Sequence, residues 1–322
     1  MSRPAIGVVG IGYWGTKIAR EYLTIQRKFG TVELAAICDS REGQIQKFRA
    51  RLGYPRRRTF SELQDFLKSG VEGVHICTPN DTHYEIASST LDEGKAVLVE
   101  KPMTMKYRDA ESLVRKGADL NLPVIAGQIY RFNNGVKRAA QIVQGGALGD
   151  ISHIKIEWKA LATFHDPNSD ILFDLGPHAF DITNMLIGEW PIHVECSSYD
   201  PRSTGISEIA YLRASYKDRK AVHIELNWAY PAKTRTVSVI GKRKSLHLDC
   251  LNQIITMYSN SARPVRMGFR RNNAMRSELL YFGKCCSHLN DSMGIGEIAL
   301  KIVEILDKKT RRQTRKEAPE KR

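Results

Sequence analysis

Gly10-Ile11-Gly12-Tyr13-Trp14-Gly15 follows a short apolar run, Ala5–Val9, and opens a helical pattern. In a strand-to-helix turn with this spacing, the first glycine permits a tight turn and the second lets the backbone approach a pyrophosphate. The third lets the helix pack closely against the strand. The helix N-terminus adds free N–H groups and the positive end of its dipole. The stretch predicts a phosphate-binding turn, although an ordinary strand-to-helix connection also uses glycines.

An acidic residue, Asp39, comes directly after the second apolar run, Val32–Cys38. It stands later than the roughly 20 residues of the simple motif, because the first helix and its loop are longer. A carboxylate here accepts hydrogen bonds from both adenosine ribose hydroxyls and repels a 2′-phosphate, which predicts NAD as cofactor. Ser40 and Arg41 follow and offer a phosphate site, so NADP stays open. A plain turn role for Asp39 is the remaining alternative.

Residues 5–126 alternate short β-branched runs with helical patterns, which is typical of a parallel sheet with crossover helices. We therefore predict an α/β Rossmann domain over residues 1–126. The expected strands are Ala5–Val9, Val32–Cys38, Gly73–Cys77, Ala96–Val99 and Pro123–Ala126, with helices near 14–27, 42–52, 61–68, 82–93 and 107–119.

The rhythm changes after residue 127. A helix near 134–145 leads into a longer alternating run, Ile151–Trp158, and further alternating runs follow. This pattern predicts an α+β domain over 127–307 with an open antiparallel sheet. A final apolar helix is expected over 295–307. We expect the basic tail, 308–322, to be flexible, because it is polar and contains Pro319.

Composition supports two ordinary globular domains. The chain has 322 residues, of which 42% are hydrophobic and 26% charged, as in folded proteins that build a core. No apolar run reaches the about 18 residues of a membrane-spanning helix, and the start resembles no signal peptide. We expect a cytoplasmic protein whose cysteines are reduced thiols; they are Cys38, Cys77, Cys196, Cys250, Cys285 and Cys286.

The formal net charge is +14, and basic residues cluster in Arg56–Arg58, in the stretch 263–276 and in the tail. Nucleic-acid binding is disfavoured, because no aromatic-interleaved or zinc-finger pattern accompanies the charge. A positive field that attracts an anionic substrate fits better. A plain solvated surface explains the same residues. No metal site is expected, because His165, His223 and His247 have no partners at ligand spacing.

Polar residues gather where predicted parallel strands end, which is where ligands bind in such sheets. One strand runs into Thr78-Pro79-Asn80 with His83 nearby, although a helix-capping turn would explain these residues too. The next runs into Glu100-Lys101-Pro102, which places an ammonium toward the nicotinamide end. The last runs into 127–133, which crosses to the second domain.

In these motifs the chain resembles the glucose–fructose oxidoreductase / inositol dehydrogenase / MocA family. The resemblance rests on Gly10–Gly15, Thr78–Asn80, Glu100–Pro102 and Arg131-Phe132-Asn133, and on Asp174-Leu175-Gly176-Pro177-His178 with Asp181. Gln128 stands where members often have His, Asn134 replaces Pro, and Asn168-Ser169-Asp170 replaces a glycine run. Within the family, the chain resembles the nucleotide-sugar 3-dehydrogenases that act on UDP-N-acetylglucosamine or its uronic acid.

The resemblance implies a Rossmann domain and an open-faced sheet used for contacts in a homo-oligomer, a dimer or tetramer. It implies a substrate between the nicotinamide and the Asp174/His178 element. The residues expected at the cofactor are Gly10, Ile11, Gly12, Tyr13, Trp14, Gly15, Asp39, Ser40, Arg41, Thr78, Pro79, Asn80, His83, Glu100, Lys101 and Gln128. Those expected at the substrate are Lys101, Tyr130, Arg131, Asn133, Asp174 and His178.

The expected chemistry is oxidation of a secondary alcohol, in which NAD takes the hydride and a side chain takes the proton. His178 suits a general base, and Lys101 would stabilise developing negative charge on the oxygen. Asp174 faces the same side as His178 if the turn is helical, but Pro177 is unfavourable beyond a first turn. Which of Lys101 and His178 finally holds the proton stays open.

Alternative functions also stay open. The substrate would then be a free sugar, a cyclitol or another small carbonyl compound. A non-catalytic dinucleotide-binding regulator is the other alternative, and it would need neither Lys101 nor His178. His178 as a core histidine on an apolar helix is the structural alternative to its role as a base.

Overall fold

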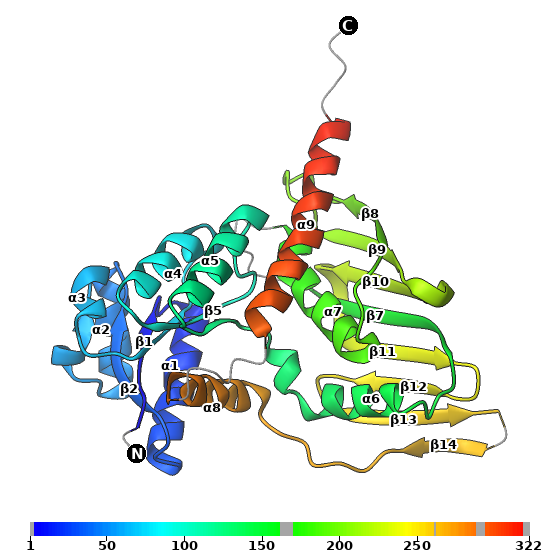
Figure 1. The fold of residues 1–322 in the computed structure, drawn as a ribbon, viewed down its shortest axis with the longest axis horizontal. Helices are drawn as coiled ribbons and strands as arrows, with labels where there is room; N and C mark the ends of the chain where they lie inside the picture. The colour runs from blue at the N-terminus through cyan, green and yellow to red at the C-terminus, as the bar shows by residue number, and fades with distance from the viewer. Residues whose placement is uncertain (1–2, 162–169, 261, 288–293, 318–322) are drawn as a thin grey trace, which may run out of the picture. The chain divides into compact units, whose positions relative to one another are not determined.

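A computed structural model describes residues 3–161, 170–260, 262–287 and 294–317. Contacts divide the chain into two compact units. Unit 1 comprises residues 1–128 and 275–304, and unit 2 comprises 129–274 and 305–322 (Figure 1). The sequence predicted one domain over 127–307, whereas residues 275–304 belong to unit 1.

Unit 1 contains a six-stranded parallel sheet in the order β3-β2-β1-β4-β5-β6. The order reverses between β1 and β4, so the loops after these strands diverge and leave room for a ligand at their carboxyl ends. The α/β prediction is confirmed. The strands are β1 (Ala5–Val9), β2 (Glu33–Cys38), β3 (Thr59–Phe60), β4 (Gly73–Ile76), β5 (Ala96–Val99) and β6 (Val124–Ala126). Only β3 was not predicted, because two residues carry no period.

Helices cover the sheet of unit 1, as the nearly all-apolar strands require. They are α1 (Tyr13–Lys28), α2 (Glu42–Leu52), α3 (Leu63–Leu67), α4 (His83–Asp92) and α5 (Tyr107–Asp119). A further helix, α8 (Ala274–Ser287), was not predicted. Its Leu279 and Phe282 are fully buried. A Cβ at Gly73 of β4 would lie 2.9 Å from Phe282 Cζ, so the absence of a side chain lets α8 sit on the sheet.

The last helix, α9 (Ile295–Glu317), is longer than the predicted 295–307. Its first part belongs to unit 1, where Ala299 and Val303 join the core, and its remainder belongs to unit 2. The expectation of a flexible tail from residue 308 is therefore corrected for 308–317. Lys, Arg, Gln and Glu are strong helix formers, and Pro319 comes only after them. Residues 318–322 lie outside the described part of the chain.

Unit 2 contains an eight-stranded sheet in the order β14-β13-β12-β11-β7-β10-β9-β8. Its pairs are antiparallel except β7 with β10, which is parallel. The predicted α+β architecture is confirmed. The strands are β7 (Ile151–Leu161), β8 (His193–Tyr199), β9 (Ile209–Ser215), β10 (Ala221–Asn227), β11 (Ala229–Gly241), β12 (Ser245–Asp249), β13 (Ile254–Ser259) and β14 (Ala262–Arg266).

Two helices, α6 (Asn134–Gln144) and α7 (Ile171–Ile187), lie on one face of this sheet (Figure 1). The strands show the expected period of two: Ile154, Ile156 and Trp158 of β7 are buried beneath the helices, while Lys155 between them is exposed. The face carrying Lys155 is the open face of the sheet.

Within the described ranges, the structure has no helix that combines the length and the apolar character needed to cross a bilayer.

Candidate active site

The three glycines of the first turn meet different constraints. Gly10 has φ of +83°, and a Cβ there would lie 2.7 Å from the Cys77 carbonyl oxygen. A Cβ at Gly15 would lie 1.8 Å from the Gly10 carbonyl oxygen, so α1 approaches β1 only because no side chain intervenes. At Gly12 the nearest atom is Arg41 Nη2, 3.7 Å away. The open space at Gly12 fits a group held against the backbone, as a pyrophosphate would be.

The Asp39 carboxylate faces this glycine turn. Asp39 Oδ2 accepts a hydrogen bond from the Ile11 amide at 2.9 Å, and Oδ1 accepts one from the Arg41 amide at 3.0 Å. The Arg41 guanidinium also binds the carboxylate, which raises the pKa of Arg41. Tyr13, Ser40 and Arg41 are exposed around it. This corner can hold a ribose through Asp39, or a phosphate through Arg41.

His83 holds two loops together. Its ring is fully buried at the start of α4, with Nδ1 2.9 Å from the Pro102 carbonyl oxygen and Nε2 3.0 Å from the Thr78 carbonyl oxygen. The ring thus joins the loop of Thr78-Pro79-Asn80 to the loop of Lys101. Because both ring nitrogens face carbonyls within the protein, we expect His83 to support cofactor binding through these loops and not by direct contact.

Glu100 lies at the carboxyl end of β5, and two donors converge on one of its oxygens. Trp14 Nε1 donates to Glu100 Oε1 at 2.6 Å, and His75 Nε2 lies 3.3 Å from the same atom. Burial opposes the charge of this carboxylate, but His75, Trp14 and the adjacent Lys101 ammonium together lower its pKa. Glu100 is therefore an ionised carboxylate beside Lys101. Nothing in the sequence patterns pointed to His75 as its partner.

Gln128, just beyond β6, is only 2% exposed. Its amide oxygen makes no hydrogen bond to the described residues. A buried acceptor of this kind favours a ligand that donates, as an amide does.

In unit 2, α7 carries the Asp174/His178 element within one continuous helix. Asp170 caps the helix, its Oδ1 accepting the Phe173 amide at 3.0 Å. Asp174 lies in the first turn and His178 one turn later, while Pro177 is accommodated inside the helix. The four-residue spacing therefore places the two side chains on the same helix face. Asp174 therefore lies in the same helix as His178, which the presence of Pro177 had left open.

Aromatic side chains surround this pair. The Tyr130 ring makes edge contacts with the His178 and Trp158 rings, each at a centroid distance of 5.1 Å. Trp228 Nε1 donates to Asp174 Oδ2 at 3.1 Å. Burial raises the pKa of Tyr130 to about 12, so its hydroxyl remains a donor at neutral pH. Imidazole, carboxylate and phenol thus lie within one cluster.

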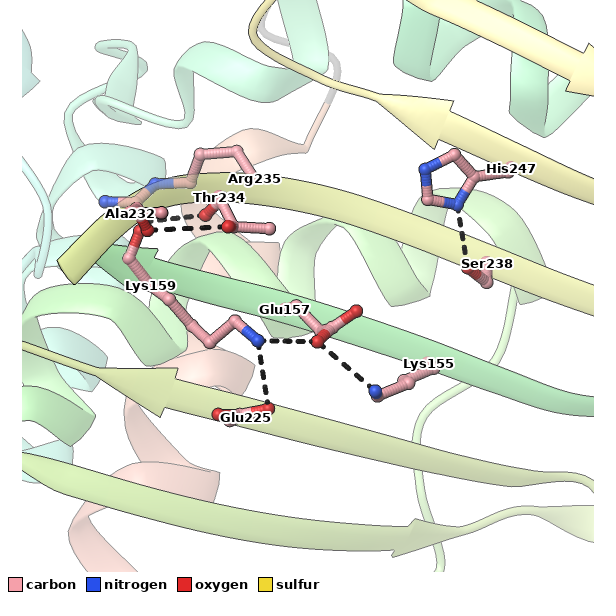
Figure 2. Close-up of polar contacts among 9 residues, drawn as sticks. All are labelled: Lys155, Glu157, Lys159, Glu225, Ala232, Thr234, Arg235, Ser238 and His247. Atoms are coloured by element: carbon pink, nitrogen blue, oxygen red, sulfur yellow. Dashed lines mark hydrogen bonds and ion pairs between the residues drawn. The ribbon is translucent and has the colours of Figure 1, made fainter. Parts of the chain in front are cut away.

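Arg235 of β11 belongs to the same neighbourhood. Burial lowers its pKa, whereas Tyr130 and Asp174 act in the opposite direction. Its Nη1 donates to the carbonyl oxygens of Lys159 at 2.9 Å and Thr234 at 3.0 Å (Figure 2). No sequence motif singles out Arg235, although its spacing from the buried Val237 and Val239 places it on the helix-covered face.

Two expected substrate residues have structural partners. Arg131 forms an ion pair with Asp181 and donates to Asn184 Oδ1 at 2.9 Å. Asn133 caps α6 by accepting the Val136 amide at 3.1 Å, and its Nδ2 donates to the Cys250 carbonyl oxygen at 3.2 Å. These contacts position the chain segment that carries Tyr130, so an indirect role is favoured for both residues.

One group in the described part of the chain has a donor set suited to a metal ion. It consists of His75, Cys77 and Glu100, whose ligand atoms lie within 4.8 Å of one another. Glu100 and His75 are already hydrogen-bonded to each other and to protein groups. The expectation of no metal stays a prediction; His165 lies outside the described residues.

Comparison with known proteins gives matches to both halves of the chain. Residues 5–128 match the oxidoreductase family with an NAD-binding Rossmann fold, and residues 136–247 match the GFO/IDH/MocA C-terminal domain. The chain is 24% identical over 256 residues to UDP-N-acetylglucosamine 3-dehydrogenase of Acidithiobacillus ferrooxidans, which covers 80% of this chain and 77% of that protein.

The fold is shared with solved structures, and two of them serve as examples. The Acidithiobacillus ferrooxidans enzyme aligns with a TM-score of 0.81 at 21% identity, over 95% of this chain and 96% of that one. An inositol dehydrogenase homologue from Azotobacter vinelandii, complexed with NADH and myo-inositol, aligns with a TM-score of 0.85 at 17% identity, over 95% and 94%. The chain therefore belongs to the Gfo/Idh/MocA family of NAD(P)-dependent oxidoreductases.

Proposed function

We propose that this oxidoreductase oxidises a secondary hydroxyl of a sugar-like substrate, with the C3 hydroxyl of a nucleotide sugar as the preferred target. The observation that carries the proposal is the cluster of His178, Asp174 and Tyr130 in unit 2. It brings a proton acceptor, a carboxylate and a phenol together, which is the equipment for binding and deprotonating an alcohol. The nucleotide-sugar choice is supported by the relative from Acidithiobacillus ferrooxidans.

Bound NAD would supply the hydride acceptor, held at the open backbone of Gly12 and at Asp39. His178 takes the hydroxyl proton as the alcohol becomes a ketone. Asp174 orients a neighbouring hydroxyl or the imidazole, and Tyr130 donates a hydrogen bond to a substrate oxygen. Lys101 stabilises the developing alkoxide. Either Lys101 or His178 is able to hold the proton at the end.

Thermal stability in the presence of ligands, followed by absorbance of reduced nicotinamide, tests this function. A ligand that binds only the folded state raises Tm. We expect NAD with UDP-N-acetylglucosamine or its uronate to raise Tm and to produce NADH. UDP alone would raise Tm without producing NADH, and free N-acetylglucosamine would do neither.

Two variants test the roles. His178→Asn and Lys101→Met should each lose about 10²–10⁴-fold in turnover while still binding NADH. Near-normal turnover in either variant would remove that residue from the proposed mechanism.

A cyclitol substrate is the second candidate, favoured by the relation to a myo-inositol 2-dehydrogenase of Thermotoga maritima, 24% identical over 195 residues that cover 57% of this chain and 55% of that protein. NADH formation with myo-inositol, and none with UDP-sugars, would support it. The cytoplasmic location expected from the sequence stays a prediction.

Assembly as a dimer or tetramer is proposed through the open face of the unit 2 sheet. That face exposes Tyr211 and Ile240, which are 48% and 43% accessible. Between them lies a row of charges, in which Glu157 pairs with Lys155 and Lys159, and Lys159 with Glu225 (Figure 2). Light scattering should give a multiple of 36.4 kDa. Ile240→Glu should lower that mass, whereas Leu251→Glu, exposed outside the strands, should not.

A further inference from the structure

Glu100 connects separate elements of unit 1 through its carboxylate. Oε1 accepts the indole N–H of Trp14, which lies in the first turn of α1 next to Gly15. The same oxygen faces His75 of β4. The other oxygen lies against Gly127, where a Cβ would come within 3.0 Å of Oε2. The residue before Lys101 is thus fixed from the glycine turn, from β4 and from the end of β6.

His75 is fully buried, and its two ring nitrogens have different partners. Nε2 faces Glu100 Oε1 at 3.3 Å and Nδ1 faces the Tyr22 hydroxyl at 3.4 Å. An ionised carboxylate only accepts, so Nε2 must carry a proton to bond Glu100. Nδ1 then faces the Tyr22 hydroxyl, and the chain of polar contacts runs from Tyr22 through His75 to Glu100.

We propose that His75 is a positioning residue for the cofactor and Lys101. By fixing the Glu100 carboxylate, it holds Trp14 of the phosphate-binding turn in a defined position relative to the loop of Lys101. Its mode of action is indirect, because its nitrogens contact Tyr22 and Glu100. The inference rests on the proposed function for its effect on turnover. Its effect on dinucleotide binding follows from the geometry of unit 1 alone.

The ionisation of Glu100 depends on what surrounds it. The titratable and charged groups around the network are His75 of β4, Cys77 directly after it, Tyr22 of α1, Lys101, and Glu278 and Cys286 of α8. Burial raises the pKa of Glu100, and His75 is the strongest influence that lowers it. Without the His75 donor, Glu100 should take up a proton at higher pH and release its hold on Trp14. The acid side of the pH–rate profile should then move upward.

A pair of variants separates positioning from packing. His75→Phe keeps a planar ring without donors, whereas His75→Gln keeps an N–H at the distance of Nε2. For His75→Phe we expect NADH affinity to fall about tenfold, as for loss of a hydrogen bond to a charged group, and the acid limb of kcat/KM to shift to higher pH. His75→Gln should restore most of the NADH affinity and most of the wild-type pH dependence of kcat/KM. Circular dichroism and Tm confirm that each variant is folded.

Two results would overturn the proposal. One is a folded His75→Phe protein with wild-type NADH affinity and pH profile. The other is a His75→Gln protein as impaired as His75→Phe at equal Tm, since that would assign His75 to packing. NADH titration by nicotinamide fluorescence needs no substrate. If wild-type enzyme oxidises none of the tested alcohols, the proposed function fails, while the titration still decides the role of His75.

Discussion

Asp39 and Arg41, two residues apart at the end of β2, form an ion pair with Arg41 Nε 3.1 Å from Asp39 Oδ1. The Asp39 side chain is only 4% exposed and that of Arg41 is 64% exposed. The carboxylate thus faces the glycine turn, while the guanidinium covers it from the solvent side. A ribose with a free 2′-hydroxyl suits the first group, and a 2′-phosphate suits the second.

Substitutions at this pair should change the preference between NAD and NADP. Asp39→Ser removes the group that repels a phosphate and leaves Arg41 free to bind it, so Kd for NADP should fall relative to NAD by about tenfold or more. Arg41→Ala should weaken NADP alone. Isothermal titration with both dinucleotides checks this, with Arg57→Ala as the exposed control. An Asp39→Ser protein that keeps the wild-type ratio would refute the assignment.

The hydrogen bond from Trp228 to Asp174 should matter for catalysis. Trp228→Phe keeps the aromatic packing and removes the indole donor, so Asp174 loses one of its fixed partners. We expect kcat to fall about tenfold, the usual effect of losing one hydrogen bond to a charged group, with NADH affinity unchanged. Steady-state kinetics measures the first and fluorescence titration the second. Trp190→Phe in the same unit is the control, and an equal loss there would exclude a specific role for Trp228.

Asp181 should make stability depend on pH. Burial raises its pKa to about 7, and the Arg131 ion pair offsets this only in part. Since the folded pKa lies above the unfolded value of about 3.9, its contribution is fully present below that value and is lost as pH rises through about 7. The Tm of the wild type should therefore fall relative to that of Asp181→Asn as pH rises from about 4 to about 7, because Asp181 is protonated at the acid end whereas the asparagine stays neutral throughout. If calorimetry shows that the Tm values of wild type and Asp181→Asn change with pH in parallel, the prediction is contradicted.

The fold was predictable wherever a local period or a turn residue determines the structure. Short apolar runs predicted five strands of unit 1, and alternation predicted the unit 2 sheet. Helix α8 was not predicted, because Phe282 packs against Gly73 of the distant β4, and a contact between residues so far apart in the chain leaves no local pattern. The extent of α9 was underestimated for a related reason: polarity suggested flexibility, whereas the helix propensity of the same residues extends the helix.

The candidate site divides in a similar way. Motif spacing predicted Gly12, Asp39, Glu100 and the α7 pair as site residues. It did not reveal His75 or Trp228, since these contact site residues 25 or more positions away in the chain. It did not reveal Arg235 either, because that residue reaches the site through its position on a strand. Conversely, Arg131 and Asn133 belong to a matched motif, yet their polar groups bind Asp181 and the backbone. A motif thus predicts which segments meet, while the partner of each side chain depends on packing.

Two glycines of the first turn should separate folding from cofactor binding. A Cβ at Gly12 meets only Arg41 Nη2 at 3.7 Å, so Gly12→Ala should fold with wild-type Tm. The methyl group would occupy the space where the backbone approaches the pyrophosphate, and NADH affinity should fall about tenfold or more. Gly15→Ala places a Cβ 1.8 Å from the Gly10 carbonyl oxygen and should lower Tm as well. Gly43→Ala, in open space on α2, should lower neither Tm nor NADH affinity. If Gly12→Ala binds NADH normally, the dinucleotide does not pass over this turn.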